Sequence, residues 1–387
     1  MTLLIALLFS FGGTLLYDLR LRQAVKNAPQ LLPISPAVLP ATAVIVPAYN
    51  EAENIERCLM AAIESSPANF NLWLIDDQST DETLAIAQLL QESLQDPRLH
   101  ILESQPRPAG ERWVGKNWAC TQAAEQTSSE YLLFIDADVR LKVEAIETVV
   151  QTAEAEQADL LTLALGIECG CLAEWLVQPL MISTLLLGFD FAAVNDPQSE
   201  TAFAAGPFML FRRSAYEQIG GHRAVADQVV EDVELSRRIK RSGHKLRYFL
   251  GGQLASVRMY RSFAALWEGW TKNLYLGSGR NLRGMIQFIV LMLLVCTLPW
   301  LALVGLLTKA LFVPLNLWDW SAIALSTITV LIHYDLRCVG SKLSQIPTRY
   351  WWLTSVGGIL VAAIALASII KTETGIGWTW RGRSLAD

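Results

Sequence analysis

The stretch YLLFIDAD, residues 131–138, is an apolar run that ends in two carboxylates, Asp136 and Asp138. A short apolar run of this kind is typical of a buried strand in a parallel sheet. Open sheets of this type bind ligands outside the carboxyl ends of their strands. The two acids therefore fall where a hard cation, Mg2+ or Mn2+, can take oxygen ligands and share them with phosphates. Isolated acid pairs also occur in solvated turns, so the choice between a cation site and a turn depends on the neighbouring segments.

A second strand is predicted upstream, in TAVIVPAYNE, residues 42–51. Its β-branched run over residues 42–46 predicts a buried strand. We expect Pro47 to stop that strand and Asn50 and Glu51 to open a helix. This segment therefore predicts a strand, a loop and a helix start.

A third strand is predicted in NLWLIDDQSTDE, residues 71–82, and it ends at Asp76 and Asp77. Ser79 and Glu82 follow in the spacing of a capping box, which predicts a helix start. A cap alone would explain Ser79, but it does not explain two acids that precede it. Asp76 and Asp77 thus fall at another strand end, where ligands bind.

The fourth acidic segment is VEDVE, residues 230–234, which leads into a helix that Gly243 is expected to end. Acids in a first helical turn also favour the positive end of the helix dipole. That simpler explanation is preferred for Glu234. Glu231 and Asp232 remain candidates for chemistry.

Taken in chain order, Tyr-Asn-Glu, Asp-Asp-x-Ser-x-Asp, Asp-x-Asp and Glu-Asp resemble the motifs of the inverting family 2 glycosyltransferases. The resemblance covers about residues 40–275. It implies a Rossmann-like α/β fold of the GT-A type that binds a nucleotide-diphospho-sugar. It also implies a metal-dependent hexosyltransferase with Mg2+ or Mn2+.

A closer likeness is to the membrane-bound branch that contains the carotenoid (diaponeurosporenoate-type) and hopene-associated glycosyltransferases. The segments that carry it are WVGKNWA (113–119), AGPFML (205–210), GGH (220–222) and WRGR (380–383). Processive synthases of the family have a Gln-x-x-Arg-Trp motif after the Glu-Asp. Here RMYR (258–261) and WEGW (267–270) stand in its place, which favours transfer of a single sugar.

The resemblance implies a role for each candidate residue. Asp232 is the expected base, and Glu231 beside it would raise its proton affinity by repulsion between like charges. Asp138, assisted by Asp136, is expected to hold the metal. The expected donor-binding residues are Pro47, Tyr49, Glu51, Asp77, Lys116 and Asp136. The expected acceptor or interface residues are Gly206, Arg261, Trp267 and Trp270, and Arg112 is a weaker candidate. His222 either completes the metal shell or is a hydrogen-bonded loop histidine.

Composition indicates a membrane protein. The chain has 387 residues, 52% of them hydrophobic, and a net charge of −6 that argues against nucleic acid as a partner. Its six cysteines lack the spacing of a zinc site, which predicts reduced thiols. Residues 3–17 predict an uncleaved anchor, and the basic residues after it place the catalytic domain in the cytoplasm. Residues 286–307, 312–333 and 351–370 predict further spans.

The expected organisation is an anchor over residues 1–19, a proline-containing linker over 20–40, a catalytic domain over 41–283 and a membrane region over 284–387. The apolar run 172–194 predicts either a helix lying in the membrane interface or a helix in the domain core. If the last span crossed fully, it would export Lys371, Arg381 and Arg383, against the usual charge distribution. Re-entry or an interfacial position is the alternative.

The expected function is transfer of one sugar from a UDP-linked donor, with GDP as the alternative, to a hydroxyl of a membrane lipid. A carotenoid alcohol is the preferred acceptor, and a glycolipid, a hopanoid and a polyprenyl phosphate are alternatives. A flippase would need ionisable groups inside the spans, and the three C-terminal stretches have few. A noncatalytic membrane scaffold would not need acids at so many strand or helix ends.

Overall fold

The computed structural model describes residues 1–31, 39–65 and 70–385. Pro33 and Pro36 of the expected linker lie outside the described residues. The chain forms two compact units, and each is discontinuous in sequence. The α/β unit comprises Ala28–Ile167 and Phe189–Arg258, and the helical unit comprises Met1–Asn27, Glu168–Gly188 and Met259–Asp387.

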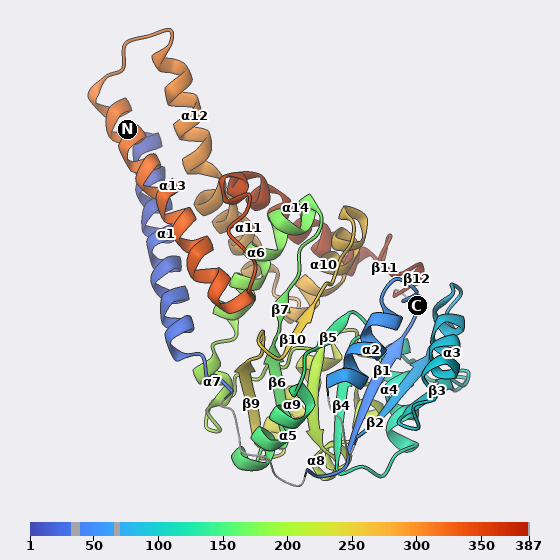
Figure 1. Cartoon of the computed structure of the whole chain (residues 1–387). Helices are drawn as coiled ribbons and strands as arrows, with labels where there is room; N and C mark the ends of the chain where they lie inside the picture. Colours follow the sequence, from blue (N-terminus) through green and yellow to red (C-terminus); the bar gives the residue numbers. More distant parts are fainter. Residues whose placement is uncertain (32–38, 66–69, 386–387) are drawn as a thin grey trace. The chain divides into compact units, whose positions relative to one another are not determined.

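A seven-stranded sheet organises the α/β unit, and its strands other than β8 are labelled in Figure 1. The strand order is β3-β2-β1-β4-β8-β6-β9, and only β8 runs antiparallel to its neighbours. The strands are β1 (Thr42–Ala48), β2 (Phe70–Asp76), β3 (Leu99–Glu103), β4 (Tyr131–Ile135), β6 (Leu160–Ala164), β8 (Phe208–Arg212) and β9 (Leu246–Leu250). Strand β4 is buried along its whole length, as its apolar sequence predicts.

The remaining elements of this unit follow the alternation typical of α/β proteins. Its helices are α2 (Ile55–Ser65), α3 (Thr83–Leu94), α4 (Gly115–Glu125), α5 (Ala145–Glu156), α7 (Phe191–Asn195), α8 (Arg213–Gln218), η1 (His222–Val225) and α9 (Glu231–Arg241). A small second sheet has the order β5-β10-β7, formed by Val139–Leu141, Ala255–Val257 and Gly166–Ile167. The α/β prediction is confirmed. Helix α9 ends as expected, with Gly243 at a φ of +76°.

Two local predictions at β1 were wrong. Pro47 does not stop the strand, because β1 continues to Ala48 and Pro47 pairs with Ile75 of β2. The pairing of β1 with β4 ends at Ile45, so the missing N–H of proline leaves no gap in that ladder. Asn50 and Glu51 do not open the helix either, since α2 begins at Ile55.

The predicted capping box before α3 was also wrong. The N-cap residue is Glu82, and no side chain caps it. The Ser79 hydroxyl instead accepts a hydrogen bond from the Asn50 N–H at 3.0 Å. The polar residues after β2 therefore join two loops at the sheet edge.

The helical unit contains the long apolar helices (Figure 1). Its elements are α1 (Thr2–Asn27), α6 (Leu172–Gly188), α10 (Phe263–Gly277), α11 (Leu282–Met292), the π-helical η2 (Leu293–Thr297), α12 (Leu298–Ala310), α13 (Leu317–Ser344), η3 (Trp351–Leu353), α14 (Thr354–Thr374) and the hairpin β11–β12 (Thr379–Trp380 and Arg383–Ser384). Within the described residues, four helical stretches are long and apolar enough to cross a membrane: 2–27, 282–310, 317–344 and 351–374. These stretches indicate membrane integration.

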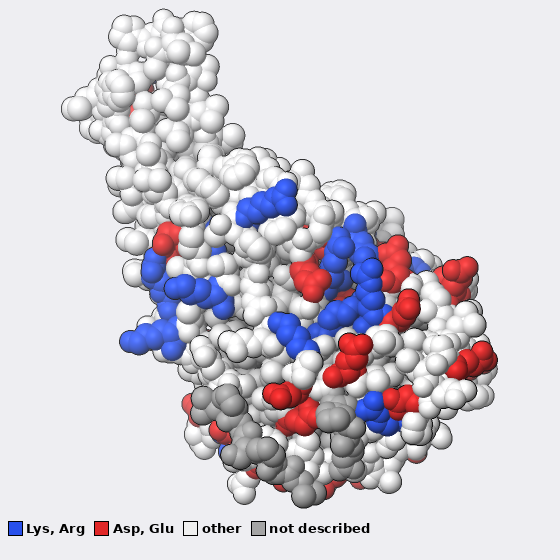
Figure 2. All heavy atoms as spheres, in the orientation of Figure 1, with Lys and Arg blue, Asp and Glu red and all other residues white. Residues whose placement is uncertain are grey.

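The expected span over residues 312–333 needs correction at both ends. Helix α13 begins at Leu317, where Asn316 and Asp319 form a capping box, and it continues to Ser344. On the face shown in Figure 2, the part of α12 and α13 farthest from the α1 C-terminus carries almost no charge, whereas basic side chains gather where α1 ends. Such a distribution is typical of a membrane helix with a polar boundary.

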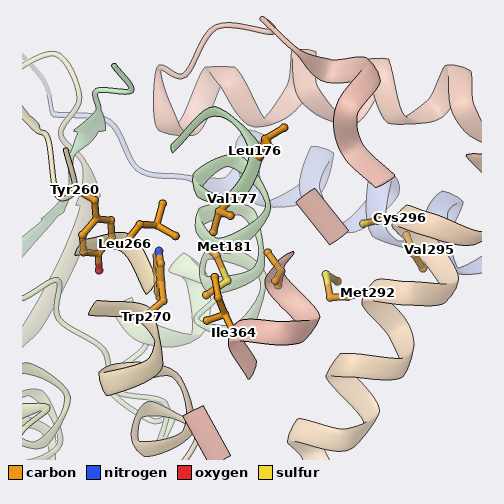
Figure 3. Close-up of a cluster of buried hydrophobic side chains, with 11 residues drawn as sticks. Leu176, Val177, Met181, Tyr260, Leu266, Trp270, Met292, Val295, Cys296 and Ile364 are labelled. Carbon is orange, nitrogen blue, oxygen red and sulfur yellow. The ribbon is translucent and has the colours of Figure 1, made fainter. Parts of the chain in front are cut away.

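The apolar run 172–194 divides between the two units. Helix α6 ends at Gly188, and α7 begins at Phe191 in the α/β unit. Figure 3 shows side chains of α6 in the core of the helical unit, packed with side chains of α10, α11, η2 and α14. Trp270 of α10 is 4% exposed, and its indole N–H donates to Gln178 Oε1 at 2.7 Å. Residues 172–188 therefore form a helix of this core.

Candidate active site

Three neighbouring strand ends create the site. Strand β1 lies between β2 and β4, and all three run parallel. Their carboxyl ends lead to Tyr49, to Asp77 and to Asp136, respectively. The antiparallel β8 begins beside the end of β4, because Phe208 pairs with Ile135. Strand β8 thus brings the Ala205-Gly206-Pro207 segment to the edge that carries the Asp-x-Asp motif.

Lys116 joins the Asp-x-Asp motif to the Glu-Asp motif. Its Nζ lies 2.7 Å from Asp136 Oδ1 and 2.8 Å from Glu231 Oε1. Although burial favours the neutral amine, these two carboxylates raise the pKa of Lys116 well above its ordinary value. Lys116 is therefore a cation shared by Asp136, which directly follows β4, and Glu231, the first residue of α9.

Asp232 is held by the backbone on both of its oxygens. Oδ2 accepts from the Gly206 N–H at 2.9 Å, and Oδ1 accepts from the Val233 N–H at 2.8 Å. Burial and the nearby charge of Glu231 raise the pKa of Asp232 to about 7, against the opposing effects of Lys116 and the two N–H groups. The arrangement presents a carboxylate that gains and loses a proton near neutral pH.

Gly206 allows this contact because it has no side chain. A Cβ at this position would lie 2.7 Å from Asp232 Oδ2, which is closer than real Cβ atoms come. The glycine therefore lets the backbone N–H reach the carboxylate.

Asn117 holds the segment that precedes the Glu-Asp motif. Its amide nitrogen donates to the carbonyls of Val225, Ala226 and Gln228 at 2.7, 3.2 and 3.0 Å. The Val114 N–H also donates to the Ala226 carbonyl at 2.7 Å. Sequence reasoning did not assign Asn117, although it lies in the quoted WVGKNWA segment.

The residues that are expected to bind the nucleotide-sugar donor lie at the strand ends and differ in exposure and in hydrogen-bond partners. Asp77 is 5% exposed, and its Oδ2 accepts from Arg107 Nη2 at 3.2 Å. Glu51 Oε2 accepts from Asn54 Nδ2 at 2.9 Å, and Tyr49 is half-buried. Arg107 was missed by sequence reasoning, whereas the weaker candidate Arg112 is exposed.

His222 lies in the core of the α/β unit. It is fully buried, and its Nδ1 lies 2.9 Å from the Tyr216 hydroxyl. Burial, with a smaller contribution from Lys116, lowers the pKa of His222 to about 3, so the ring is neutral. Its Nε2 is buried without a hydrogen-bond partner in the described part of the chain.

The two carboxylates that follow β4 suit a divalent cation that is shared with a diphosphate. Asp136 and Asp138 are half-buried and supply hard carboxylate oxygens. Among the described residues, no group of three or more His, Cys, Asp or Glu side chains is placed to hold a metal. A cation here would therefore take its remaining ligands from phosphate and water, as Mg2+ commonly does.

The other expected acceptor or interface residues, Arg261, Trp267 and Trp270, belong to the helical unit. Trp270 packs between α10 and α6 (Figure 3). Trp267 is half-buried, and its ring centroid lies 5.8 Å from that of Phe263. Arg261 is half-buried.

Comparison with known proteins identifies the α/β unit. Residues 43–220 match the sequence profile of "Glycosyl transferase family 2". They form a family 2 glycosyltransferase domain. The matched region contains β1, β2 and β4 and the Asp-x-Asp motif, and it ends before Glu231 and Asp232.

Two curated relatives of this chain are staphylococcal enzymes. It is 27% identical over 256 residues to the 4,4'-diaponeurosporenoate glycosyltransferase of Staphylococcus haemolyticus, and 26% identical over 268 residues to the enzyme of the same name from Staphylococcus aureus. Each match spans 65% of this chain and 66% of the relative, just under two thirds of its length. The homology is distant.

A solved structure confirms the GT-A type of fold. It is a mannosyltransferase from Pyrobaculum calidifontis in complex with GDP-Man and Mn2+, at 20% identity and a TM-score of 0.57. The match covers 96% of this chain and 98% of the mannosyltransferase. The predicted GT-A fold, with an N-terminal apolar helix and long apolar helices near the C-terminus, is thus confirmed.

Proposed function

We propose that this glycosyltransferase moves one sugar from a nucleotide-diphosphate donor to a hydroxyl of a membrane lipid, with inversion at the anomeric carbon. The observation that carries the proposal is Asp232, a half-buried carboxylate that is held by two N–H groups and whose pKa is raised to about 7. An acceptor hydroxyl must lose its proton as it attacks the sugar, and a base with this pKa suits that step.

The strand-end residues would hold the donor. Asp77 and Arg107, with Tyr49 and Glu51, supply polar groups for the base and ribose, and Pro47 lies in β1 directly before them. Asp136 and Asp138 would hold Mg2+ or Mn2+, which when bound neutralises charge on the diphosphate leaving group. Lys116 would stabilise the same leaving group by its positive charge. The mannosyltransferase of similar fold was solved with GDP-Man and Mn2+, which supports a nucleotide-sugar donor and a metal.

The metal assignment can be tested at Asp138. We expect Asp138→Ala to remove Mn2+-dependent donor binding and to abolish transfer, because the cation loses a carboxylate ligand. Thermal-shift measurements with UDP and GDP, each with and without Mn2+, would also show which nucleotide binds. Turnover that persists in the presence of a chelator would contradict metal dependence.

The proposed acceptor is a lipid alcohol, preferably a hydroxylated carotenoid. The relatives are named for a carotenoid carboxylate. An ionised carboxylate or a phosphate attacks without losing a proton, so neither needs a base of this kind. Asp232 therefore favours an alcohol over a carotenoid acid or a polyprenyl phosphate. The long apolar helices favour an acceptor in the bilayer, and the basic residues after α1 favour a cytoplasmic site.

Gene disruption followed by profiling of extracted pigments and lipids would test the acceptor. Loss of a glycosylated carotenoid together with accumulation of its free alcohol is the expected result. Unchanged pigments together with a missing glycolipid, hopanoid glycoside or sugar-phosphate lipid would show that the lipid part of the missing product is the acceptor, and not a carotenoid. Accumulation of a free carotenoid acid would instead show that the acceptor group is a carboxylate, as the names of the relatives indicate.

A further inference from the structure

We propose that Lys116 keeps the metal site closed in the donor-free protein, so that the divalent cation binds Asp136 only together with the nucleotide diphosphate. This proposal rests on the proposed function, because it concerns the order in which cation and donor bind to that site. It assigns Lys116 a positioning role that precedes any chemistry.

The first argument is the geometry around Nζ. The ammonium lies within direct ion-pair distance of both Asp136 Oδ1 and Glu231 Oε1, at 2.7 and 2.8 Å. Asp136 is the carboxylate that would share the cation with Asp138. A cation that approached Asp136 would meet the ammonium within a few ångströms, where repulsion between like charges is strong. The lysine must therefore leave Asp136 before a cation can bind there.

The second argument is that the backbone of Lys116 is fixed while its side chain can move. The residue lies in the first turn of α4, between two anchors to the same loop. The Val114 N–H and the Asn117 amide both bond to the Ala226 carbonyl. The side chain, in contrast, is a flexible four-carbon stem with a compact charge. It can rotate away from Asp136 without any change in the fold.

The diphosphate supplies the reason for that rotation. A donor that enters the site brings negative charge that competes with Asp136 for the ammonium. Once Lys116 pairs with the phosphates, the Asp136 carboxylate is free of the ammonium, and Asp136 and Asp138 would then hold a cation that supplies positive charge next to the diphosphate. Cation and donor should therefore bind with strong positive cooperativity.

Mn2+ binding to the full chain in lipid nanodiscs tests the proposal, with the free ion followed by electron paramagnetic resonance and no nucleotide present. We expect Lys116→Met to bind Mn2+ about tenfold or more tightly than the wild type, because the competing charge is gone. Lys116→Arg should resemble the wild type. In the Lys116→Met background, Asp136→Asn should remove the gain.

An affinity of Lys116→Met that equals or falls below that of the wild type would overturn the proposal, as would a gain that survives Asp136→Asn. Thermal unfolding shows whether each variant is folded. If Lys116→Met is not, Lys116→Gln replaces it, since the amide removes the charge and still donates a hydrogen bond. Sugar transfer by wild-type membranes is measured separately. It can succeed or fail independently of the metal affinities, so failure of the proposed function is distinguishable.

Discussion

At the scale of single residues, the Asp232 carboxylate combines two opposing influences. Burial and Glu231 disfavour its charged form, while Lys116 and two backbone N–H groups favour it. The balance leaves a pKa of about 7, which allows the group to accept a proton under physiological conditions. The same N–H groups fix the orientation of the carboxylate.

This balance predicts the pH dependence of transfer. The base acts only when it is deprotonated, so the rate should rise with pH up to about 7 and fall about tenfold per unit below it. Asp232→Asn keeps the shape of the side chain but cannot accept the proton. It should therefore lower kcat about 10^2-fold and abolish the rise of the rate with pH. The exposed Asp227→Asn is the matched control. Unchanged turnover in Asp232→Asn, or lost nucleotide binding, would remove Asp232 from the role of base.

Gly206 permits a sharper test of the same carboxylate. Gly206→Ala places a Cβ 2.7 Å from Asp232 Oδ2, so the carboxylate must move away. We expect kcat to fall about tenfold or more with little change in nucleotide affinity, because a small misplacement of a catalytic group is costly. Gly277→Ala is the control, because a Cβ there meets nothing within 4 Å and the backbone does not have a positive φ. Normal turnover in Gly206→Ala would show that the close approach is not needed.

At the scale of the elements, sequence predicted the strand ends well because each is encoded locally. The buried run 131–135 ends at its two acids, and the 70–76 strand ends at Asp76. The loop between β1 and α2 was predicted wrongly because long-range contacts shape it. Asn50 bonds with Ser79 and Thr80, about thirty residues away.

Asn117 shows the same limit more clearly. Its amide reaches the Val225 carbonyl across a separation of 108 residues, and no spacing rule connects two such positions. The WVGKNWA motif marks the asparagine as a candidate, but only the fold shows which segment it holds. The ion pairs of Lys116 are likewise a product of tertiary structure, since they join β4 to α9 through α4.

Helix packing in the helical unit depends on small residues of α14. A Cβ on Gly357 would lie 2.4 Å from the Leu176 carbonyl oxygen of α6, and one on Gly358 would lie 2.6 Å from Cys296 Cβ. Membrane helices commonly use such residues for close backbone approach.

Gly357→Ala should therefore destabilise the protein by about 1–3 kcal/mol through overpacking. Gly305→Ala in α12 is the control, because a Cβ there meets nothing within 4 Å. Thermal unfolding in detergent compares the two variants. Equal midpoints would show that α6 and α14 can separate without cost.

At the scale of the whole molecule, contacts inside the helical unit bear on whether the last apolar segment crosses the membrane. The C-terminal hairpin is bound to α10, because Glu268 accepts hydrogen bonds from the Thr379 hydroxyl and the Arg381 N–H at 2.7 and 3.2 Å. Lys272 also lies 4.0 Å from the centroid of the Trp380 ring. The other end of α14 packs on η2, between α11 and α12.

Since α10 precedes α11 in the chain, we expect the C-terminal tail to lie on the side of the membrane from which α11 enters. Helix α14 then starts within the bundle and does not cross fully, which keeps Lys371, Arg381 and Arg383 inside. Reporter fusions at the C-terminus and in the 311–316 loop test this prediction and should report opposite sides. Reporters that lie on the same side would require α14 to cross.

The interleaved order of the two units has a practical consequence for handling this protein. The chain passes between the units four times, near residues 27, 167, 188 and 258. A single proteolytic cut at one of these junctions therefore leaves three covalent tethers and releases no free catalytic piece. A truncated fragment of residues 28–258 would still carry α6, now stripped of the helices that bury Val177 and Met181. Exposed apolar surface of that kind promotes aggregation. A well-behaved water-soluble fragment would need residues 168–188 replaced by a short polar bridge.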